Sequence, residues 1–264
     1  MLPEGKIPFV MSQDDVNYYE YMVDSDGDGL ADAGGDGFAT KIVLGEDGFP
    51  TCEYITKDGQ IVTGDYDLVP ILEAFIQEHP DFSYRGARAI LGVTGYEGVF
   101  GYRTHPDWEE ALGKEAYEKE IEEAKKVAQA LKDHGWLIAS HSFGHPAYGS
   151  ISTKKLSSDV NKWEAQVQPI VGDADILLYP FGSDIGGIGK YSGEKFTILQ
   201  EAGYKYYCNV DSAKHWVQIH DSYVRQGRRN IDGFRLYWGP NLLEDLFNPS
   251  EVLDKDRTIP VPKI

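Results

Sequence analysis

Cysteine is scarce in this sequence, and long apolar runs are missing. The 264 residues include only two cysteines, Cys52 and Cys208, which excludes a disulfide-rich scaffold and a cysteine-based metal cluster. Spacing alone leaves open whether the two pair. No apolar run reaches the roughly 18 residues of a bilayer-spanning helix, and residues 1–6 lack the apolar core of a signal peptide. We therefore expect a chain without a membrane span.

Basic residues are also few relative to acidic ones. There are 25 Lys and Arg against 43 Asp and Glu, a net charge of -18. Such a surface repels nucleic-acid phosphates and anionic membranes, so neither is expected as a partner. It suits neutral or cationic substrates. Hydrophobic residues make up 41% of the chain, which is enough to build the core of a large α/β domain.

Apolar runs alternate with amphipathic segments along the chain. The apolar runs predict strands over residues 7–12, 87–94, 136–140, 174–180, 204–210, 216–223 and 234–238. Helical periodicity predicts helices over 66–82, 152–171 and 194–202, and one helix or a helix pair over 106–134. Strands that alternate with helices indicate a parallel sheet. About seven core strands favour a single α/β domain built as a barrel.

Residues 24–64 look like an insertion after the first strand. Residues 38–56 alternate as two strands, with a turn at 46–48. Before them, acidic residues alternate with glycine in a spacing that lets several carboxylates surround one hard cation, namely Asp24, Asp26, Asp28 and Asp32. The Glu that closes an EF-hand loop is missing. Two interpretations stay open, a structural calcium site and an acidic loop without an ion.

Two histidines four residues apart follow the strand at 136–140. In His141-Ser-Phe-Gly-His145, one turn of chain separates the imidazoles, so both rings can point at one atom. Neutral imidazole is a good ligand for zinc-type metals. Chance spacing among seven histidines is the alternative, with one His packed on Phe143 and the other solvated.

Acidic residues follow the first predicted strand as a pair, Asp14 and Asp15. The carboxyl ends of parallel barrel strands meet at one mouth, so this pair and the two histidines can converge there. One carboxylate and two imidazoles form a three-ligand divalent site with open positions. A second carboxylate can then accept a proton from a metal-activated water. The alternative is a surface turn in which Asp caps a helix.

These segments resemble three motifs of the polysaccharide deacetylase family, which includes chitin and peptidoglycan deacetylases. The segments are Ser12-Gln-Asp14-Asp15, His141-Ser-Phe-Gly-His145 and Tyr179-Pro-Phe-Gly182. The resemblance implies a distorted (β/α)7-type barrel and one catalytic domain over residues 1–264. It implies Asp14 as general base and a metal, zinc most readily, on Asp15, His141 and His145. It also implies deacetylation of a chitin-like or peptidoglycan-like polysaccharide, outside the cell or at its surface.

The sequence departs from the family in its later motifs. Leu178 stands where the family has an Arg beside the base, and Arg103, Arg228 or Arg229 is the replacement to expect. Val217-Gln-Ile-His220 has the form of the last motif, which makes His220 the candidate general acid, or else an exposed loop histidine.

Several residues are candidates for contact with substrate. We expect the Tyr179 backbone N–H or a neighbouring one to hold the oxyanion, with Arg103 as a further contact. Sugar stacking or core packing is expected for four aromatic residues, Tyr96, Phe100, Tyr102 and Trp216. Two other functions stay open, a metal-dependent amidase or esterase of a non-sugar substrate and a catalytically inactive glycan-binding barrel.

Overall fold

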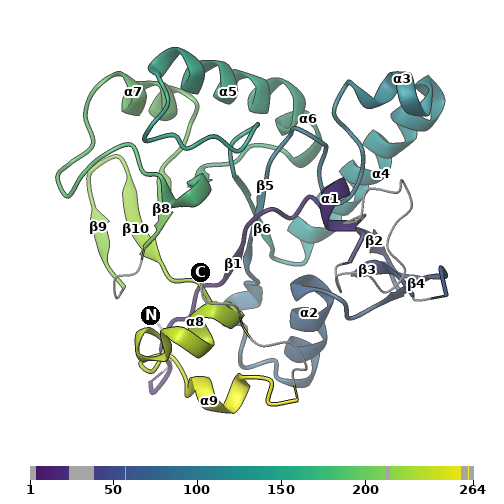
Figure 1. Ribbon diagram of the computed structural model, residues 1–264, viewed down its shortest axis with the longest axis horizontal. Helices are drawn as coiled ribbons and strands as arrows, with labels where there is room; N and C mark the ends of the chain where they lie inside the picture. Colours follow the sequence, from purple (N-terminus) through teal and green to yellow (C-terminus); the bar gives the residue numbers. More distant parts are fainter. Residues whose placement is uncertain (1–3, 24–38, 57, 212–214, 257–260, 262–264) are drawn as a thin grey trace.

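The computed structural model describes residues 4–23, 39–56, 58–211, 215–256 and 261. Its main element is a seven-stranded sheet of order β1-β5-β6-β7-β8-β10-β9 (Figure 1). The strands are β1 (Ser12–Gln13), β5 (Ile90–Val93), β6 (Leu137–Ser140), β7 (Ile176–Leu178), β8 (Tyr206–Val210), β9 (Val217–Ile219) and β10 (Val224–Arg228). All neighbours pair in parallel except β9, which is antiparallel to β10. Within the described ranges no ladder joins β9 to β1, so the predicted seven-stranded barrel is confirmed in a distorted, open form.

A separate antiparallel sheet follows the first strand. It consists of β2 (Lys41–Leu44), β3 (Pro50–Ile55) and β4 (Ile61–Gly64), in the order β2-β3-β4. The two strands predicted over residues 38–56 are therefore confirmed, and β4 is a third strand that was not predicted. The role of residues 24–64 as an insertion stays a prediction.

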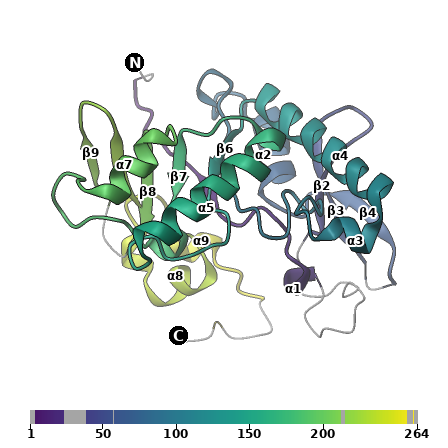
Figure 2. The same cartoon turned by 90° about the horizontal axis from the view of Figure 1, so that it is seen from above.

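Helices cover one face of the large sheet, as the view from above shows (Figure 2). They are α2 (Leu68–Glu78), α3 (Trp108–Leu112), α4 (Lys114–Asp133), α5 (Thr153–Gln166), α6 (Gln168–Val171) and α7 (Glu194–Glu201). Each predicted helix is present, and the segment 106–134 is a helix pair. The short elements are α1 (Glu20–Val23), α8 (Gly233–Trp238), α9 (Pro249–Val252), η1 (Tyr84–Gly86), η2 (Pro180–Gly182) and η3 (Pro240–Leu242).

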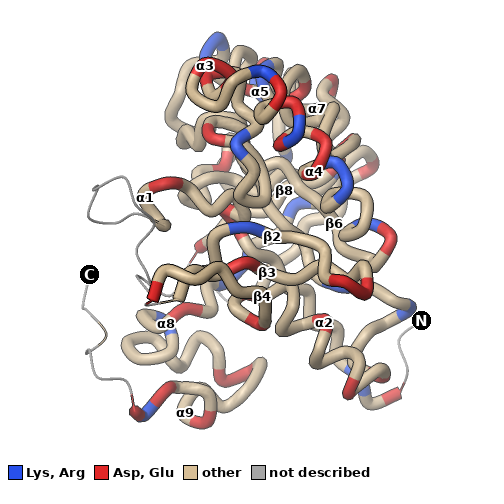
Figure 3. Tube along the Cα trace, turned by 90° about the vertical axis from the view of Figure 1, so that its right-hand side faces the viewer, with Lys and Arg blue, Asp and Glu red and all other residues tan. Residues whose placement is uncertain are grey.

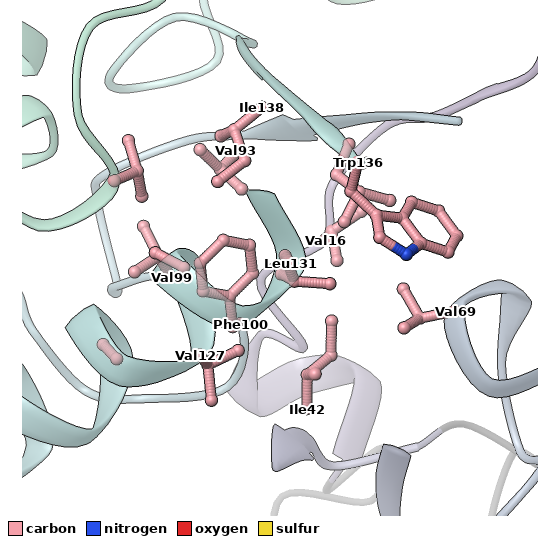
Figure 4. Close-up of a cluster of buried hydrophobic side chains, with 14 of the residues drawn as sticks. Val16, Ile42, Val69, Val93, Val99, Phe100, Val127, Leu131, Trp136 and Ile138 are labelled. Carbon is pink, nitrogen blue, oxygen red and sulfur yellow. The ribbon is translucent and has the colours of Figure 1, made fainter. Parts of the chain in front are cut away.

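The largest core lies between α4, α2 and the strands β5 and β6 (Figure 4). Helix α4 contributes a stripe spaced by three and four residues, Ala124, Val127, Ala128 and Leu131, all buried. Trp136, at the start of β6, is 1% exposed, and its indole N–H donates to Glu73 at 2.6 Å. This packing fixes where β6 ends and hence where the histidine segment begins.

Side chains alternate between the two faces of the sheet. Leu177 and Tyr207 pack under α5 and α7. The other face carries a small apolar cluster, Ile90, Ala139, Ile176, Leu178 and Cys208. Successive residues of a strand point to opposite faces of the sheet. Polar residues that continue the spacing of this second cluster therefore lie on the same face, at the carboxyl ends of the strands.

Two of the predicted strands are wrong. Residues 7–12 are not a buried strand, since Ile7 is 85% exposed and only Ser12 and Gln13 pair with β5. The last strand is β10, whereas residues 234–238 belong to α8, which the Asp232 side chain caps by accepting the Arg235 N–H at 2.6 Å. This cap favours a helix through local interactions alone, and the apolar run of residues 234–238 did not indicate it.

Charged residues of both signs lie along the outer helices α4 and α5 (Figure 3). Their pairs on α4 are exposed and three or four residues apart, as between Lys126 and Glu123, and such pairs contribute little to stability. In the described part of the chain, no helix combines the length and the apolar character that a membrane crossing requires.

Candidate active site

Three side chains converge at the carboxyl end of the sheet. Asp15, His141 and His145 each offer one ligand atom, and these atoms lie within 4.8 Å of one another. The two imidazole Nε2 atoms are 3.1 Å apart, and His145 Nε2 is 3.7 Å from an Asp15 oxygen. Two ligand atoms about 2.1 Å from a tetrahedral zinc lie about 3.4 Å apart. The observed separations therefore fit a divalent metal, held by one oxygen and two nitrogens.

His141 is positioned by the strand next to it. It directly follows β6 and is 2% exposed, and its Nδ1 lies 2.7 Å from the carbonyl oxygen of Leu178 in β7. A hydrogen bond from Nδ1–H to that carbonyl leaves the Nε2 lone pair free for a metal. The backbone of β7 therefore orients the first histidine ligand.

Four residues around the site have left-handed backbone conformations. They are Asp15 (φ 57), Ser142 (φ 66), His145 (φ 55) and Phe181 (φ 57). Residues other than glycine seldom adopt this region, and such positions cluster at functional sites because surrounding structure must hold them there. Two of the three candidate ligands are among them, so the loops are shaped to aim these side chains.

A carboxylate on α5 holds the loop between the histidines. Asp159 accepts the backbone N–H groups of Phe143 at 2.8 Å and Gly144 at 2.9 Å, and the Tyr148 hydroxyl at 2.7 Å. These three bonds fix the turn that carries His145. The sequence analysis missed Asp159, and its place in the middle of an amphipathic helix gave no signal.

Asp14 lies beside the cluster and is paired with an arginine. Arg228, the last residue of β10, donates to both oxygens of Asp14, at 2.7 and 2.9 Å. One Asp14 oxygen is 3.9 Å from His141 Nε2. Burial alone would raise the pKa of Asp14, but the Arg228 hydrogen bonds and charge, with the two histidines, lower that pKa below its ordinary value. Arg228 therefore takes the place left by Leu178.

The pKa of His145 is lowered below its ordinary value. Burial lowers the pKa of His145, and the charge of His141 acts in the same direction, while Asp15 raises it less than burial lowers it. A neutral imidazole is the form that binds metal. Its ring also meets the exposed ring of Phe181, with centroids 4.5 Å apart.

Tyr179 does not offer its amide to a substrate. Its N–H donates to the Cys208 carbonyl at 2.9 Å as part of the strand ladder, and its ring is fully buried. Pro180 has no N–H, so the next amide is that of Phe181, which donates no hydrogen bond within the described part of the chain. Among the described residues, the neighbouring Phe181 amide therefore has no hydrogen-bond acceptor, whereas that of Tyr179 is used in the sheet.

Arg103 is occupied away from Asp14. Its guanidinium donates to the Tyr18 carbonyl at 3.0 Å and lies 3.6 Å from Glu97. Arg229 pairs with Asp245 at 2.6 Å. Of the three arginines proposed from sequence to support the base, the structure brings only Arg228 to Asp14.

His220 lies at the amino end of β10, away from the cluster. It follows β9, and its N–H donates to the Tyr223 carbonyl, directly before β10 begins. The first residue of β10 pairs with the first residue of β8. Arg228 ends β10, so four residues, about 13 Å at 3.3 Å per residue, separate the two ends of this strand. This placement argues against His220 as the general acid, because the strand's opposite end reaches the cluster.

The aromatic candidates divide by burial. Phe100 and Tyr102 are 0% and 5% exposed and belong to the core, so of the two alternatives core packing is confirmed for them. Trp216 is partly exposed, and its indole N–H donates to Asp211 at 2.9 Å. Tyr96 stacks on Tyr19.

Other expectations concern the acidic loop, the cysteines and further concave surfaces. Asp24, Asp26, Asp28 and Asp32 lie outside the described residues, so the calcium site stays a prediction. Cys52 and Cys208 are both buried free thiols. An open groove of about 690 Å³ lies between α5 and α7 and contains none of the cluster residues.

Comparison with known proteins gives one family match and several distant structural likenesses. Residues 113–207 match the family model described as polysaccharide deacetylase. No curated protein matches the chain. Among solved structures, the chain is similar to a de-N-acetylase from Aggregatibacter actinomycetemcomitans, with 12% identity and a TM-score of 0.40 over 67% of this chain and 71% of that one. It is also similar to the Streptococcus pyogenes deacetylase PplD, with 15% identity and a TM-score of 0.34 over 60% of each chain.

A third likeness is to a CE4 family pseudoenzyme from Bacillus anthracis, with 14% identity and a TM-score of 0.32 over 52% of this chain. This alignment spans only 36% of the pseudoenzyme's own length.

Proposed function

We propose that this chain, whose residues 113–207 match the polysaccharide deacetylase family model, is a metal-dependent hydrolase that removes acetyl groups from a polysaccharide. One observation carries the proposal. The ligand atoms of Asp15, His141 and His145 lie within 4.8 Å of one another. Asp14 lies beside them and accepts two hydrogen bonds from Arg228. A metal set with a spare carboxylate is what amide or ester hydrolysis by water requires.

We propose zinc as the metal, held by Asp15, His141 and His145. Two imidazoles and one carboxylate are the donors of catalytic zinc sites, which keep a further position open. When bound, such an ion supplies polarisation of the acyl carbonyl and a water whose pKa is about 7.

Asp14 is the proposed general base. Its pKa is lowered by Arg228, so it is ionised at neutral pH and able to accept a proton from the attacking water. Arg228 holds both of its oxygens from one side, which fixes the carboxylate relative to His141. The proton accepted by Asp14 is then available to the leaving group.

The Phe181 N–H is the amide proposed to stabilise the oxyanion. It follows β7, adjoins the His145 ring through its own side chain and has a left-handed backbone. An N–H without an internal acceptor is free to donate when negative charge develops on the acyl oxygen.

Exposed aromatic rings support a polysaccharide as substrate. Phe181 is 73% exposed beside His145, and Tyr21 is 60% exposed near Asp15, whose charge contributes to raising the pKa of Tyr21. Sugar rings stack on such faces, and the net charge of -18 suits a neutral or amino-bearing glycan. A chitin-like or peptidoglycan-like chain meets both conditions. Because such polymers lie outside the cell, we propose an extracellular or cell-surface location.

The test combines metal content with acetate release. The purified protein is assayed for bound zinc and for acetate released from chitin oligomers and from peptidoglycan. His141→Ala should lose both the zinc and the activity. His220→Ala is the matched histidine control, and it should keep both. A wild-type protein that holds no metal and releases no acetate from either polymer would refute the proposal.

Asp14→Asn separates the base from the metal ligands. It should retain zinc and lose about 10²- to 10⁴-fold in rate, the usual contribution of a positioned base. An unchanged rate would remove Asp14 from the mechanism. Release of product from a simple acyl amide but from neither polymer would indicate a non-sugar amidase.

A second function, glycan binding without turnover, is favoured by one observation. The imidazoles of the cluster are both in ligand positions, and His220 lies beside the amino end of β10, whose carboxyl end reaches the site. A separate imidazole acid is therefore lacking among the described residues of the cluster. Binding of chitin oligomers by zinc-loaded protein without acetate release would select this function.

A further inference from the structure

A buried tyrosine hydroxyl contacts one of the candidate metal ligands. Tyr19 is 1% exposed, and its hydroxyl donates to Asp15 Oδ1 at 2.9 Å. We propose that Tyr19 is a positioning residue that fixes the Asp15 carboxylate for the metal. This inference rests on the metal site of the proposed function, and its measurement does not require turnover.

The Tyr19 hydroxyl is itself held from the other side. It lies 2.6 Å from the hydroxyl of Thr94, the residue that follows β5 and is fully buried. Asn17 ties Thr94 in place, since its side chain accepts the Thr94 N–H at 3.0 Å and donates to the Thr94 carbonyl at 2.9 Å. Asn17 also donates to the carbonyl of Gly98. A continuous buried chain of hydrogen bonds therefore runs from the end of β5 to Asp15.

This chain acts on a residue that needs support. Asp15 has a φ of 57°, a conformation that residues other than glycine seldom adopt unless neighbours hold it. With Oδ1 bonded to Tyr19, Oδ2 accepts no hydrogen bond from the described residues and lies 3.9 Å from His141 Nε2. Fixing one oxygen restricts rotation of the carboxylate, so less conformational freedom remains to be lost on metal binding.

Packing alone does not explain the hydroxyl. The Tyr19 ring stacks on Tyr96 with centroids 4.6 Å apart and 15° between planes, and a phenylalanine would make that contact equally well. Among the described residues, the hydroxyl adds the hydrogen bonds to Asp15 and Thr94. A purely structural tyrosine would therefore lose stability on removal of its oxygen, without a specific loss of metal affinity.

The experiment compares two tyrosine hydroxyls of equal burial. Tyr19→Phe and Tyr207→Phe each remove one hydroxyl from a residue that is 1% exposed, and the Tyr207 hydroxyl donates to the Tyr204 carbonyl at 2.9 Å. Full-length metal-free proteins are titrated with zinc by calorimetry, and their melting temperatures are recorded without metal. We expect Tyr19→Phe to weaken zinc binding about 10- to 100-fold, as removal of outer-shell partners does. Tyr207→Phe should bind zinc as the wild type does.

Equal zinc affinity in Tyr19→Phe and the wild type overturns the inference, as does an equal loss in both variants. If Tyr19→Phe does not fold, Thr94→Val takes its place, and a zinc affinity reduced about threefold or more is then required. A wild type that binds zinc but releases no acetate refutes the proposed hydrolysis and leaves this test valid. An active wild type with unchanged zinc affinity in the variant refutes the inference alone.

Discussion

Arg228→Gln is the substitution that most directly tests the base and its support. Arg228 donates to both oxygens of Asp14, at 2.7 and 2.9 Å, and to the Ser12 hydroxyl at 2.9 Å. The side chains of Arg228 and Asp14 are 13% and 27% exposed. Glutamine keeps a donor and much of the volume but removes the charge and the two-pronged geometry.

The exposure of the two side chains sets the expected loss of stability. Exposed ion pairs contribute up to about 1 kcal/mol, whereas removal of one partner from a fully buried pair costs about 3–5 kcal/mol. This pair lies between these limits, so we expect Arg228→Gln to lose about 2 kcal/mol of unfolding free energy at pH 7. Arg229→Gln is the comparison, because Asp245, the partner of Arg229, is 47% exposed, and the contribution of that ion pair should stay below about 1 kcal/mol.

The pH dependence gives the sharper test. Burial by itself raises the pKa of Asp14, but Arg228 brings it below the ordinary value, which is about 3.9. A carboxyl group whose folded pKa is lowered contributes stability above its unfolded pKa, and that stability is lost as pH falls through the folded pKa. The difference between wild type and Arg228→Gln should be full at pH 7 and shrink below about pH 4.

Urea unfolding of the metal-free proteins at several pH values measures this difference. A double-mutant cycle with Asp14→Asn isolates the pair, with an expected coupling within the usual range of about 0.5–3 kcal/mol. Zinc-loaded Arg228→Gln should also lose about tenfold or more in rate, since the base is no longer fixed. A pH-independent stability difference, or a coupling near zero, would refute the assignment of Arg228 as the partner of Asp14.

The histidine loop and the acidic segment offer three further tests. Asp159→Ala removes the acceptor of three hydrogen bonds, so we expect a loss of about 2–4 kcal/mol in urea unfolding and weaker zinc binding by calorimetry. Burial lowers the pKa of His145, so as the pH falls the unfolded chain binds this proton at a higher pH than the folded protein does. The melting temperature of the metal-free protein should therefore decrease below about pH 6.5, and His145→Gln should reduce that decrease. If residues 24–32 bind calcium, a calcium-selective chelator should lower the melting temperature of zinc-replete protein, and a flat response would contradict the site.

Local patterns were sufficient for most elements of the fold. The stripe of Ala124, Val127 and Leu131 repeats every three or four residues, and the core helix α4 forms where that period holds. The apolar run at 87–94 contains β5, whose four residues are all buried. Patterns failed where neighbours decide burial. Ile71 and Phe75 continue the apolar spacing of α2, yet they are 51% and 42% exposed, and Phe75 meets the rings of His79 and Phe82 at the surface.

The supports of the site could not be read along the chain. Arg228 reaches Asp14 from 214 positions away, and Asp159 and Tyr19 act through hydrogen bonds that depend on where α5 and β5 are packed. The residues around His220 match the form of the last motif, but the antiparallel pairing of β9 with β10 places His220 at the amino end of β10. A sequence motif specifies residue types and their order along the chain, whereas these contacts depend on the order and direction of the strands in the sheet.

The sequence by itself predicted which residues come together, because imidazoles spaced by four can point at one atom and the carboxyl ends of parallel strands meet at one mouth. Tertiary structure alone decided which groups orient them. The carboxylate, imidazole and guanidinium follow or end different strands, and the strand order β1-β5-β6-β7-β8-β10 of the curled sheet places the Arg228 guanidinium 2.7 Å and His141 Nε2 3.9 Å from Asp14.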